Sequence, residues 1–123
     1  ALGRRGKKLL AVLQWHLDWG QRITALQEIA ERRAAKGQRT PSWDDRPILH
    51  EDLAEVWQAF VDLGAGRVVE WTAHPIPVTE IEAVLRLQGV TDSEDRAEWL
   101  RLIRAMDQRW LAWARQKNQA SGT

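Results

Sequence analysis

The last long stretch of the chain, residues 91–117, constrains the fold more than any other part of the sequence. Its large apolar side chains recur at steps of four, three, four and three, which places them along one face of an α-helix: Trp99, Ile103, Met106, Trp110 and Trp113. Thr91 and Glu94 match the capping box found at helix starts. The sequence therefore predicts a helix of about 25 residues, with Trp99, Ile103 and Met106 in the core.

A second long periodic run extends from about residue 7 to residue 35. Its apolar seam alternates steps of four and three: Val12, His16, Trp19, Ile23, Leu26 and Ala30. Gly20 interrupts the run and allows a kink, and Gly37 is a typical residue just beyond a helix C-terminus. The seam either packs inside the monomer or pairs with a second copy. His16, on this seam, is expected to be a core or interface residue, not a ligand.

A shorter helix is predicted between these two runs. Residues 38–47 contain two prolines and turn-forming side chains, so they predict a linker. Residues 49–63 then show a helical apolar pattern that stops at Gly64. The apolar face of this helix consists of Leu49, Leu53, Val56 or Trp57, Phe60 and Leu63.

The chain then becomes irregular before a further short helix. Residues 68–72 indicate short extended structure, and residues 74–78 predict an extended strap because each of its two prolines disfavours helix in the preceding residue. A capping-box match at Thr79 and Glu82 starts a helix that ends at Gly89. The apolar side of this helix consists of Ile81, Val84, Leu85 and Leu87.

These elements predict a small all-α fold of about four helices, two long and two short, with a proline-marked irregular strap between the second and the third. We divide the chain into a basic N-terminal helical arm, residues 1–40, and a compact helical domain, residues 41–123. The two parts are expected to form one structural unit.

Charge is unevenly distributed between these two parts. Residues 1–40 hold nine Lys and Arg against three Asp and Glu, while residues 41–123 hold nine against fourteen. Either the two parts complement each other inside the fold, or the basic part meets an acidic partner or nucleic acid. Nucleic-acid binding is not expected, because the acidic first turn of the last helix, with Asp92 and Glu94, would repel phosphates.

Catalytic and metal-binding motifs are absent from the sequence. Without cysteine there is no thiolate site, and the three histidines are scattered without metal-ligand spacing. We find neither a phosphate-binding glycine loop nor a nucleophile elbow. We therefore expect a protein that is not an enzyme and needs no cofactor or metal. The absence of cysteine fits a cytoplasmic protein. No apolar run approaches the roughly 18 residues that span a bilayer.

Eight tryptophans beside one phenylalanine and no tyrosine are an unusual aromatic usage. Such rings either fill a small helical core or stay partly exposed as anchors for a partner, since tryptophan is enriched at interface hot spots. The candidate partner-binding residues are Trp43, Trp57, Trp71, Trp110 and Trp113.

Several segments, in their order and spacing, carry a family resemblance. They are LAEVWQAFVDL at residues 53–63, Arg67, PIPVTEI at residues 75–81, LIRAMD at residues 102–107, and Trp110 with Leu111. Together, within residues 46–113, they resemble the small tail assembly chaperones of long-tailed phages and prophages.

The resemblance implies a non-enzymatic protein that acts in the cytoplasm of an infected or lysogenic bacterial host. Its implied partner is the long, helical, apolar tape-measure protein, kept soluble until tail-tube subunits polymerise around it. Two other functions remain open: a virion structural or connector subunit, and a small phage protein that binds and modulates a host protein.

Overall fold

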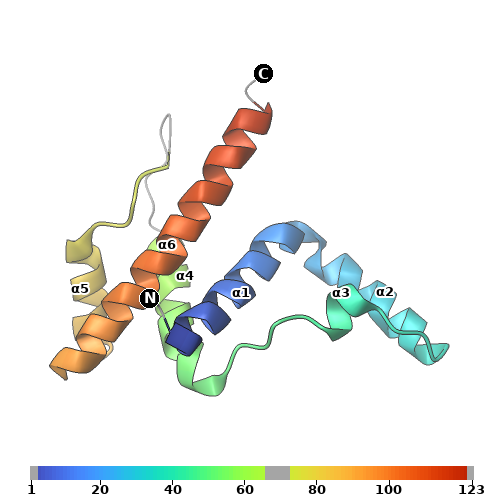
Figure 1. The fold of residues 1–123 in the computed structure, drawn as a ribbon, viewed down its shortest axis with the longest axis horizontal. Helices are drawn as coiled ribbons and strands as arrows, with labels where there is room; N and C mark the ends of the chain where they lie inside the picture. Colours follow the sequence, from blue (N-terminus) through green and yellow to red (C-terminus); the bar gives the residue numbers. More distant parts are fainter. Residues whose placement is uncertain (1–2, 66–72, 122–123) are drawn as a thin grey trace.

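The computed structural model describes residues 3–65 and 73–121, and its regular elements are helical, as predicted. Figure 1 shows their arrangement. In chain order they are α1 (Gly3–Trp19), the 3₁₀ turn η1 (Gly20–Arg22), α2 (Ile23–Ala35), α3 (Pro41–Asp44), the 3₁₀ turn η2 (Glu51–Leu53), α4 (Ala54–Ala65), α5 (Val78–Leu87) and α6 (Ser93–Ser121). None of these helices has the combined length and apolar character that crossing a membrane requires.

Helix α6 is the central element, as its apolar periodicity suggests. It packs against α1, α4 and α5, while α2 and α3 lie together to one side of this body (Figure 1). Ile103 and Met106 are completely buried, and Trp99 packs half-buried against the same core. The predicted core positions of α6 are thus confirmed for Ile103 and Met106.

The core also draws on α1, from the basic N-terminal part of the chain. Leu9 and Leu13 are 1% and 4% exposed and belong to the same cluster as the buried residues of α4, α5 and α6. Arg5 pairs with Asp52 at 2.6 Å and with Glu98 at 3.0 Å. The basic and acidic parts of the chain therefore complement each other at this point. The boundary at residue 40 stays a prediction.

The predicted helix from residue 7 to residue 35 is broken in two. Gly20 adopts a φ of +49°, in the left-handed region that glycine enters without steric cost, and the 3₁₀ turn η1 follows it. Beyond this turn, α2 packs mainly against α3. Leu26 and Ala30 of the heptad-like seam are buried, so these two positions are covered within the chain. Gly37 ends α2 as predicted, with a φ of +72°.

The predicted linker, residues 38–47, contains the one-turn helix α3. Proline occupies its first position, where the missing N–H costs nothing. The Asp44 carboxylate accepts the Thr40 N–H at 2.7 Å and so closes the turn. The Arg33 guanidinium of α2 donates to the Arg39 carbonyl at 2.7 Å, which holds α3 against α2.

Both predicted capping boxes were wrong. Helix α6 begins one residue later than Thr91 requires, because the carboxylate of Asp92 accepts the N–H groups of Glu94 and Asp95, both at 3.1 Å. Helix α5 begins at Val78, so Thr79 already lies inside its first turn. The extended Pro77 precedes this helix, its carbonyl accepts the N–H groups of Glu80 and Ile81, and its own side chain offers no cap.

Two further boundary predictions need correction. The helix predicted for residues 49–63 starts as the 3₁₀ turn η2, and α4 continues through Gly64 to Ala65. Leu87, assigned to the apolar side of the short helix, is 86% exposed. It lies at the last position of α5, where its neighbours Ile81 and Leu85 face the core without it.

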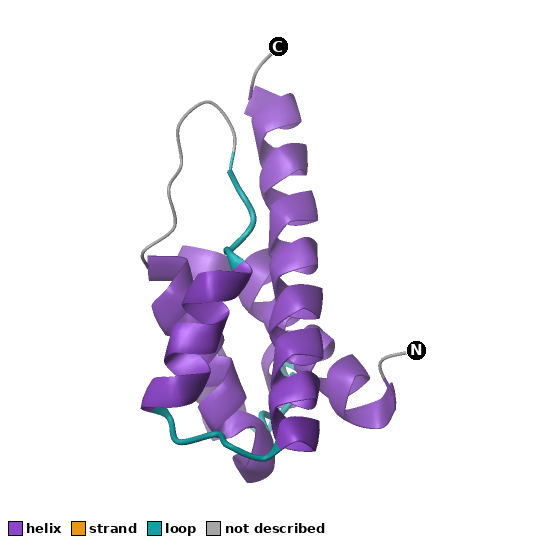
Figure 2. Ribbon diagram, turned by 90° about the vertical axis from the view of Figure 1, so that its left-hand side faces the viewer, coloured by secondary structure: helices purple, strands orange, loops and turns teal. Residues whose placement is uncertain are grey.

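The strap that leads into α5 is tied to α6. Ile76 is 7% exposed, and its N–H donates to the carboxylate of Asp107, itself 5% exposed, at 3.0 Å. Figure 2 shows this segment running beside α6. A strap without helical hydrogen bonds needs such an acceptor, because a buried N–H left unpaired is costly. The predicted extended segment, residues 68–72, lies outside the described residues.

Replacing Asp107 by alanine should lower the free energy of unfolding by about 1–3 kcal/mol, since it leaves the buried Ile76 N–H without this acceptor. Asp107→Asn retains a carbonyl oxygen and should lose less. Urea denaturation measures both changes, and faster hydrogen exchange at the Ile76 amide should accompany the alanine variant. Equal stability of wild type and Asp107→Ala would show that this contact contributes nothing.

Candidate functional site

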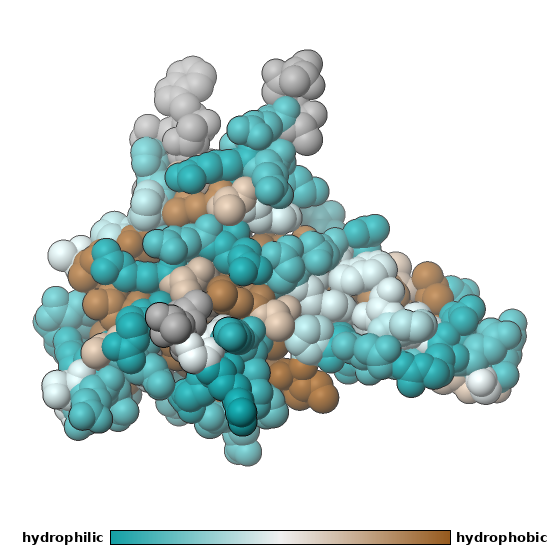
Figure 3. Space-filling view, viewed as in Figure 1, coloured by the Kyte–Doolittle hydropathy of each residue, from teal (hydrophilic) through white to brown (hydrophobic). Residues whose placement is uncertain are grey.

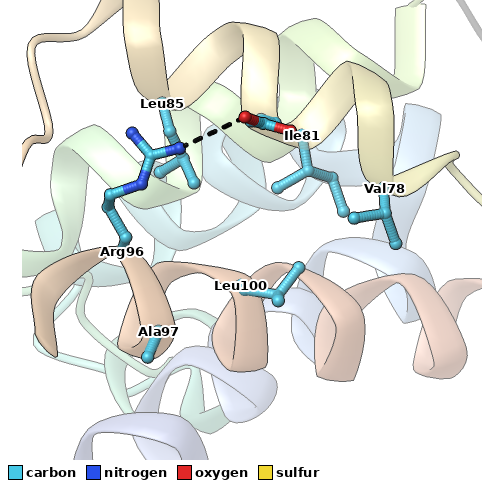
Figure 4. Close-up of a pocket in the computed structure, with 7 residues that line it drawn as sticks. Val78, Ile81, Leu85, Arg96, Ala97 and Leu100 are labelled. Atoms are coloured by element: carbon cyan, nitrogen blue, oxygen red, sulfur yellow. Dashed lines mark ion pairs between the residues drawn. The ribbon is translucent and has the colours of Figure 1, made fainter. Parts of the chain in front are cut away.

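An apolar groove of about 220 Å³ lies between α5 and α6 (Figure 4). We call it the α5–α6 groove, and it is lined by Val78, Ile81, Glu82, Leu85, Arg96, Ala97 and Leu100. Its α5 wall comes from positions 78, 81 and 85, spaced by three and four so that they share one helix face. Its α6 wall comes from positions 97 and 100, again one turn apart.

The walls of the α5–α6 groove differ in burial. Ile81 and Leu85 are 1% and 4% exposed and connect the groove to the core, whereas Val78 is 46% exposed. Ala97 is exposed and has the smallest side chain among the lining residues, so space remains above it. The groove is therefore an apolar depression open to solvent, and not an extension of the closed core.

A charged pair marks one end of this groove. Arg96 reaches from α6 towards Glu82 of α5, with 3.7 Å between the closest nitrogen and oxygen, while Val78 lies towards the other end (Figure 4). Arg96 also donates to the Val90 carbonyl at 3.0 Å, which fixes its position. One donor and one acceptor group thus stand beside an otherwise aliphatic surface.

The size of the groove indicates the class of ligand it suits. Small-molecule pockets usually enclose about 300–1,000 Å³ and bury most of their ligand. The α5–α6 groove is smaller and open, which suits one or two aliphatic side chains of a protein partner better than a cofactor. Within residues 3–65 and 73–121, no three His, Asp or Glu side chains gather as metal ligands.

A tryptophan cluster lies where α1 meets α3 and α4; we call it the junction cluster, and it consists of Trp15, His16, Trp43 and Trp57. The rings of Trp15 and Trp43 have centroids 6.1 Å apart, and the indole N–H of Trp15 donates to the Ser42 carbonyl at 3.0 Å. The rings of His16 and Trp57 are 5.2 Å apart. These contacts bring together side chains from three separate helices.

Trp43 is half-buried, with its ring covered by a cation. The Arg46 guanidinium carbon lies 3.7 Å from the Trp43 ring centroid, within the range of a cation–π contact, and Arg46 donates to the Trp43 carbonyl at 2.7 Å. Ile48, two residues further along, is 74% exposed and lines a second depression beside the cluster. The segment around α3 therefore presents both an aromatic ring and an aliphatic side chain near the surface.

His16 was expected to be a core or interface residue, and it contacts two rings of the junction cluster. Its ring centroid is 5.3 Å from that of Trp15 and 5.2 Å from that of Trp57. Desolvation by these neighbours lowers the pKa of His16 below its usual value, which favours the neutral ring. The side chain stays exposed on its remaining surface, so this desolvation is partial.

A second aromatic pair lies on the C-terminal half of α6. Trp110 and Trp113 have ring centroids 6.3 Å apart, and the Lys117 ammonium is 5.5 Å from the Trp113 ring centroid. Both rings are half-buried, and Trp110 packs against the core. Their burial leaves part of each ring available at the surface.

The predicted partner-binding tryptophans thus fall into two groups. Trp43 and Trp57 belong to the junction cluster, Trp110 and Trp113 lie together on α6, and Trp71 lies outside the described residues. None of the four described rings lines the α5–α6 groove. Their partner-binding role stays a prediction.

The α5–α6 groove was missed by reasoning from the sequence. The spacing of Val78, Ile81 and Leu85 was the available signal, but it predicts only an apolar helix face. Whether such a face is covered or left open depends on the helix opposite it, and here that helix presents a small residue, Ala97.

Comparison with known proteins identifies the segment that carries this groove. A family model for phage tail assembly chaperones matches residues 33–112, which is more than half of the chain. The match includes the whole α5–α6 groove, α3, α4 and most of α6, and it leaves out α1. No curated protein and no solved structure matches the chain.

Proposed function

This chain belongs to the phage tail assembly chaperone family, and we propose that it binds the tape-measure protein and keeps it soluble while the tail is built. Membership of a chaperone family points to a non-catalytic protein with a protein partner. The observation that carries the finer proposal is the α5–α6 groove, which is apolar, open and inside the matched segment.

A long helical partner with an apolar face presents a specific physical problem before assembly. Its apolar side chains face water until other subunits cover them, and large exposed apolar patches drive aggregation. A groove between two helices can receive the apolar face of a partner helix, a common mode of peptide recognition. The α5–α6 groove would cover such side chains temporarily, in the cytoplasm of the bacterial host where the tail is assembled.

The lining of the groove fits this role. Val78 and Ala97 form its exposed part, where a partner side chain would enter, and Ile81 and Leu85 form an apolar floor. The Glu82 and Arg96 pair at one end provides charged groups that would orient a partner helix. The half-buried rings of Trp110 and Trp113 would extend the contact along α6.

The proposal is tested by co-expressing this chain with fragments of a phage tape-measure protein. A fragment that precipitates alone should become soluble and copurify with the wild-type chain. Ala97→Phe fills the groove from an exposed helix position, so the fragment should return to the insoluble fraction. Ala25→Phe is the matched control, because it is the same change at an exposed position of α2, away from the groove and from the rings of Trp110 and Trp113.

Three outcomes would contradict the proposal. Failure of every wild-type fragment to copurify or gain solubility would remove the chaperone role. Equal effects of Ala97→Phe and Ala25→Phe would remove the groove as the contact site, provided that both variants melt near the wild-type temperature. Detection of the chain in purified virions by mass spectrometry would favour a connector subunit, since a chaperone should be missing from the finished particle.

A further inference from the structure

Helices α1 and α6 run side by side in the same direction, which brings together basic residues from opposite ends of the chain (Figure 1). Arg5 contacts Glu98 at 3.0 Å, and further along both helices Gln14 accepts from Arg109 at 3.1 Å. The first turns of α1 therefore lie beside the part of α6 that follows Glu98.

Both helices carry exposed cations. We call them the basic face, and they are Arg4, Lys7 and Lys8 of α1 with Arg101 and Arg104 of α6. Lys7 precedes Gln14 by two helical turns, so both lie on the flank of α1 that borders α6. Figure 3, seen from the side on which α1 and α6 lie in front, shows many hydrophilic side chains over these helices.

The cations of the basic face are without partners among residues 3–65 and 73–121. All five are exposed, and among the described residues none of them takes part in an ion pair or a side-chain hydrogen bond. Carboxylates close to this side are engaged elsewhere: Glu98 pairs with Arg5, and Asp18 accepts from Gln14 at 2.9 Å. Arg5, Arg39, Arg86 and Arg96, by contrast, each pair with a carboxylate of the chain.

The basic face continues directly from the α5–α6 groove. Ala97 and Leu100 line the groove, and Arg101 and Arg104 follow them at a spacing of four residues, which puts each arginine one turn further along the same side of α6. A partner helix seated in the groove and running along α6 would therefore place its next turns over these arginines.

We propose that the basic face binds an acidic segment that adjoins the apolar residues received by the α5–α6 groove. This inference rests on the proposed function and names the chemistry of its partner: a helix with an apolar stripe flanked by Asp and Glu. Complementary charge accelerates encounter and sets the register of a docked helix, while the groove provides the apolar burial.

The aromatic residues around the basic face favour a protein partner over a nucleic acid. Proteins that hold single strands stack bases on exposed rings. Trp99 and Trp110 of α6 instead pack against the core, and Trp15 of α1 donates to Ser42 of the α3 segment.

The test uses the full chain and a tape-measure fragment that copurifies with it. The double variant Arg101→Glu and Arg104→Glu should weaken fragment binding about tenfold in low salt, and added salt should shrink the difference. Arg32→Glu in α2 with Lys36→Glu at its C-cap is the matched control, since it changes the same charge at exposed positions away from the groove and should change binding less than about twofold. Thermal melts confirm that both variants are folded.

A second arm changes the partner. Replacing the Asp and Glu residues of the fragment by Asn and Gln should weaken binding by a similar factor. Combining this fragment with the arginine variant should weaken binding little further, as expected for groups that contact each other. If the arginine variant binds the fragment as tightly as wild type does, while Ala97→Phe loses binding, the basic face is not a contact site. The groove would then remain the proposed contact site. Displacement of the fragment by random duplex DNA but not by poly-L-glutamate also overturns it, because the face would then select nucleic acid.

Discussion

Replacing Ile103 by alanine is expected to lower the free energy of unfolding by about 2–5 kcal/mol. Ile103 is completely buried in the middle of α6, in the cluster to which α1, α4 and α5 all contribute. Removing its side chain gives up the transfer free energy of three carbons and leaves a cavity that surrounding helices fill only in part. Urea denaturation followed by circular dichroism measures the change from the midpoint and slope.

Leu87→Ala is the control for this prediction. It also truncates a large aliphatic side chain on a helix, but Leu87 is 86% exposed, so its unfolding free energy should stay within about 0.5 kcal/mol of wild type. If the two variants lose the same stability, α6 does not form the centre of the core in solution.

Leu9→Ala is expected to have an effect of similar size, about 2–5 kcal/mol. Leu9 is 1% exposed and reaches the core from α1, a helix outside the family match. Its loss should therefore destabilise the whole domain in one cooperative transition, and not only the arm. Differential scanning calorimetry should show a single transition at a lower temperature.

The neighbouring residue supplies the control for α1. Lys8→Ala removes a longer side chain from the same helix, but Lys8 is exposed, so the melting temperature should move little. If Leu9→Ala lowers the melting temperature no more than Lys8→Ala does, α1 is detached from α6 in solution.

Helix α1 belongs to the folded domain although it lies outside the family match. The family match begins at residue 33, yet α1 makes more contact with α6 than any other helix does, and it contributes Leu9 and Leu13 to the core. The matched segment by itself would leave that side of α6 uncovered. We therefore expect α1 to be required for stability, while the proposed partner contacts lie on α5, α6 and the outer surface of α1.

The amino-acid sequence predicts the helices and their buried faces because those signals are local. The three- and four-residue spacing around Ile103 and Met106 identifies the buried side of α6 without reference to any other helix. The glycine at position 37 likewise marks the end of α2, since its φ of +72° is a property of that residue and its immediate neighbours.

The features that require two distant segments came only from the fold. Ile76 donates to Asp107 across 31 residues, and Gln14 accepts from Arg109 across 95, so neither pairing has a local signal. The α5–α6 groove and the basic face have the same origin: an apolar or charged helix face is visible in the sequence, but packing decides which neighbour covers it. Packing is a property of complementary surfaces in three dimensions, and here it left the α5–α6 groove open beside exposed cations of α6 that pair with no other described residue.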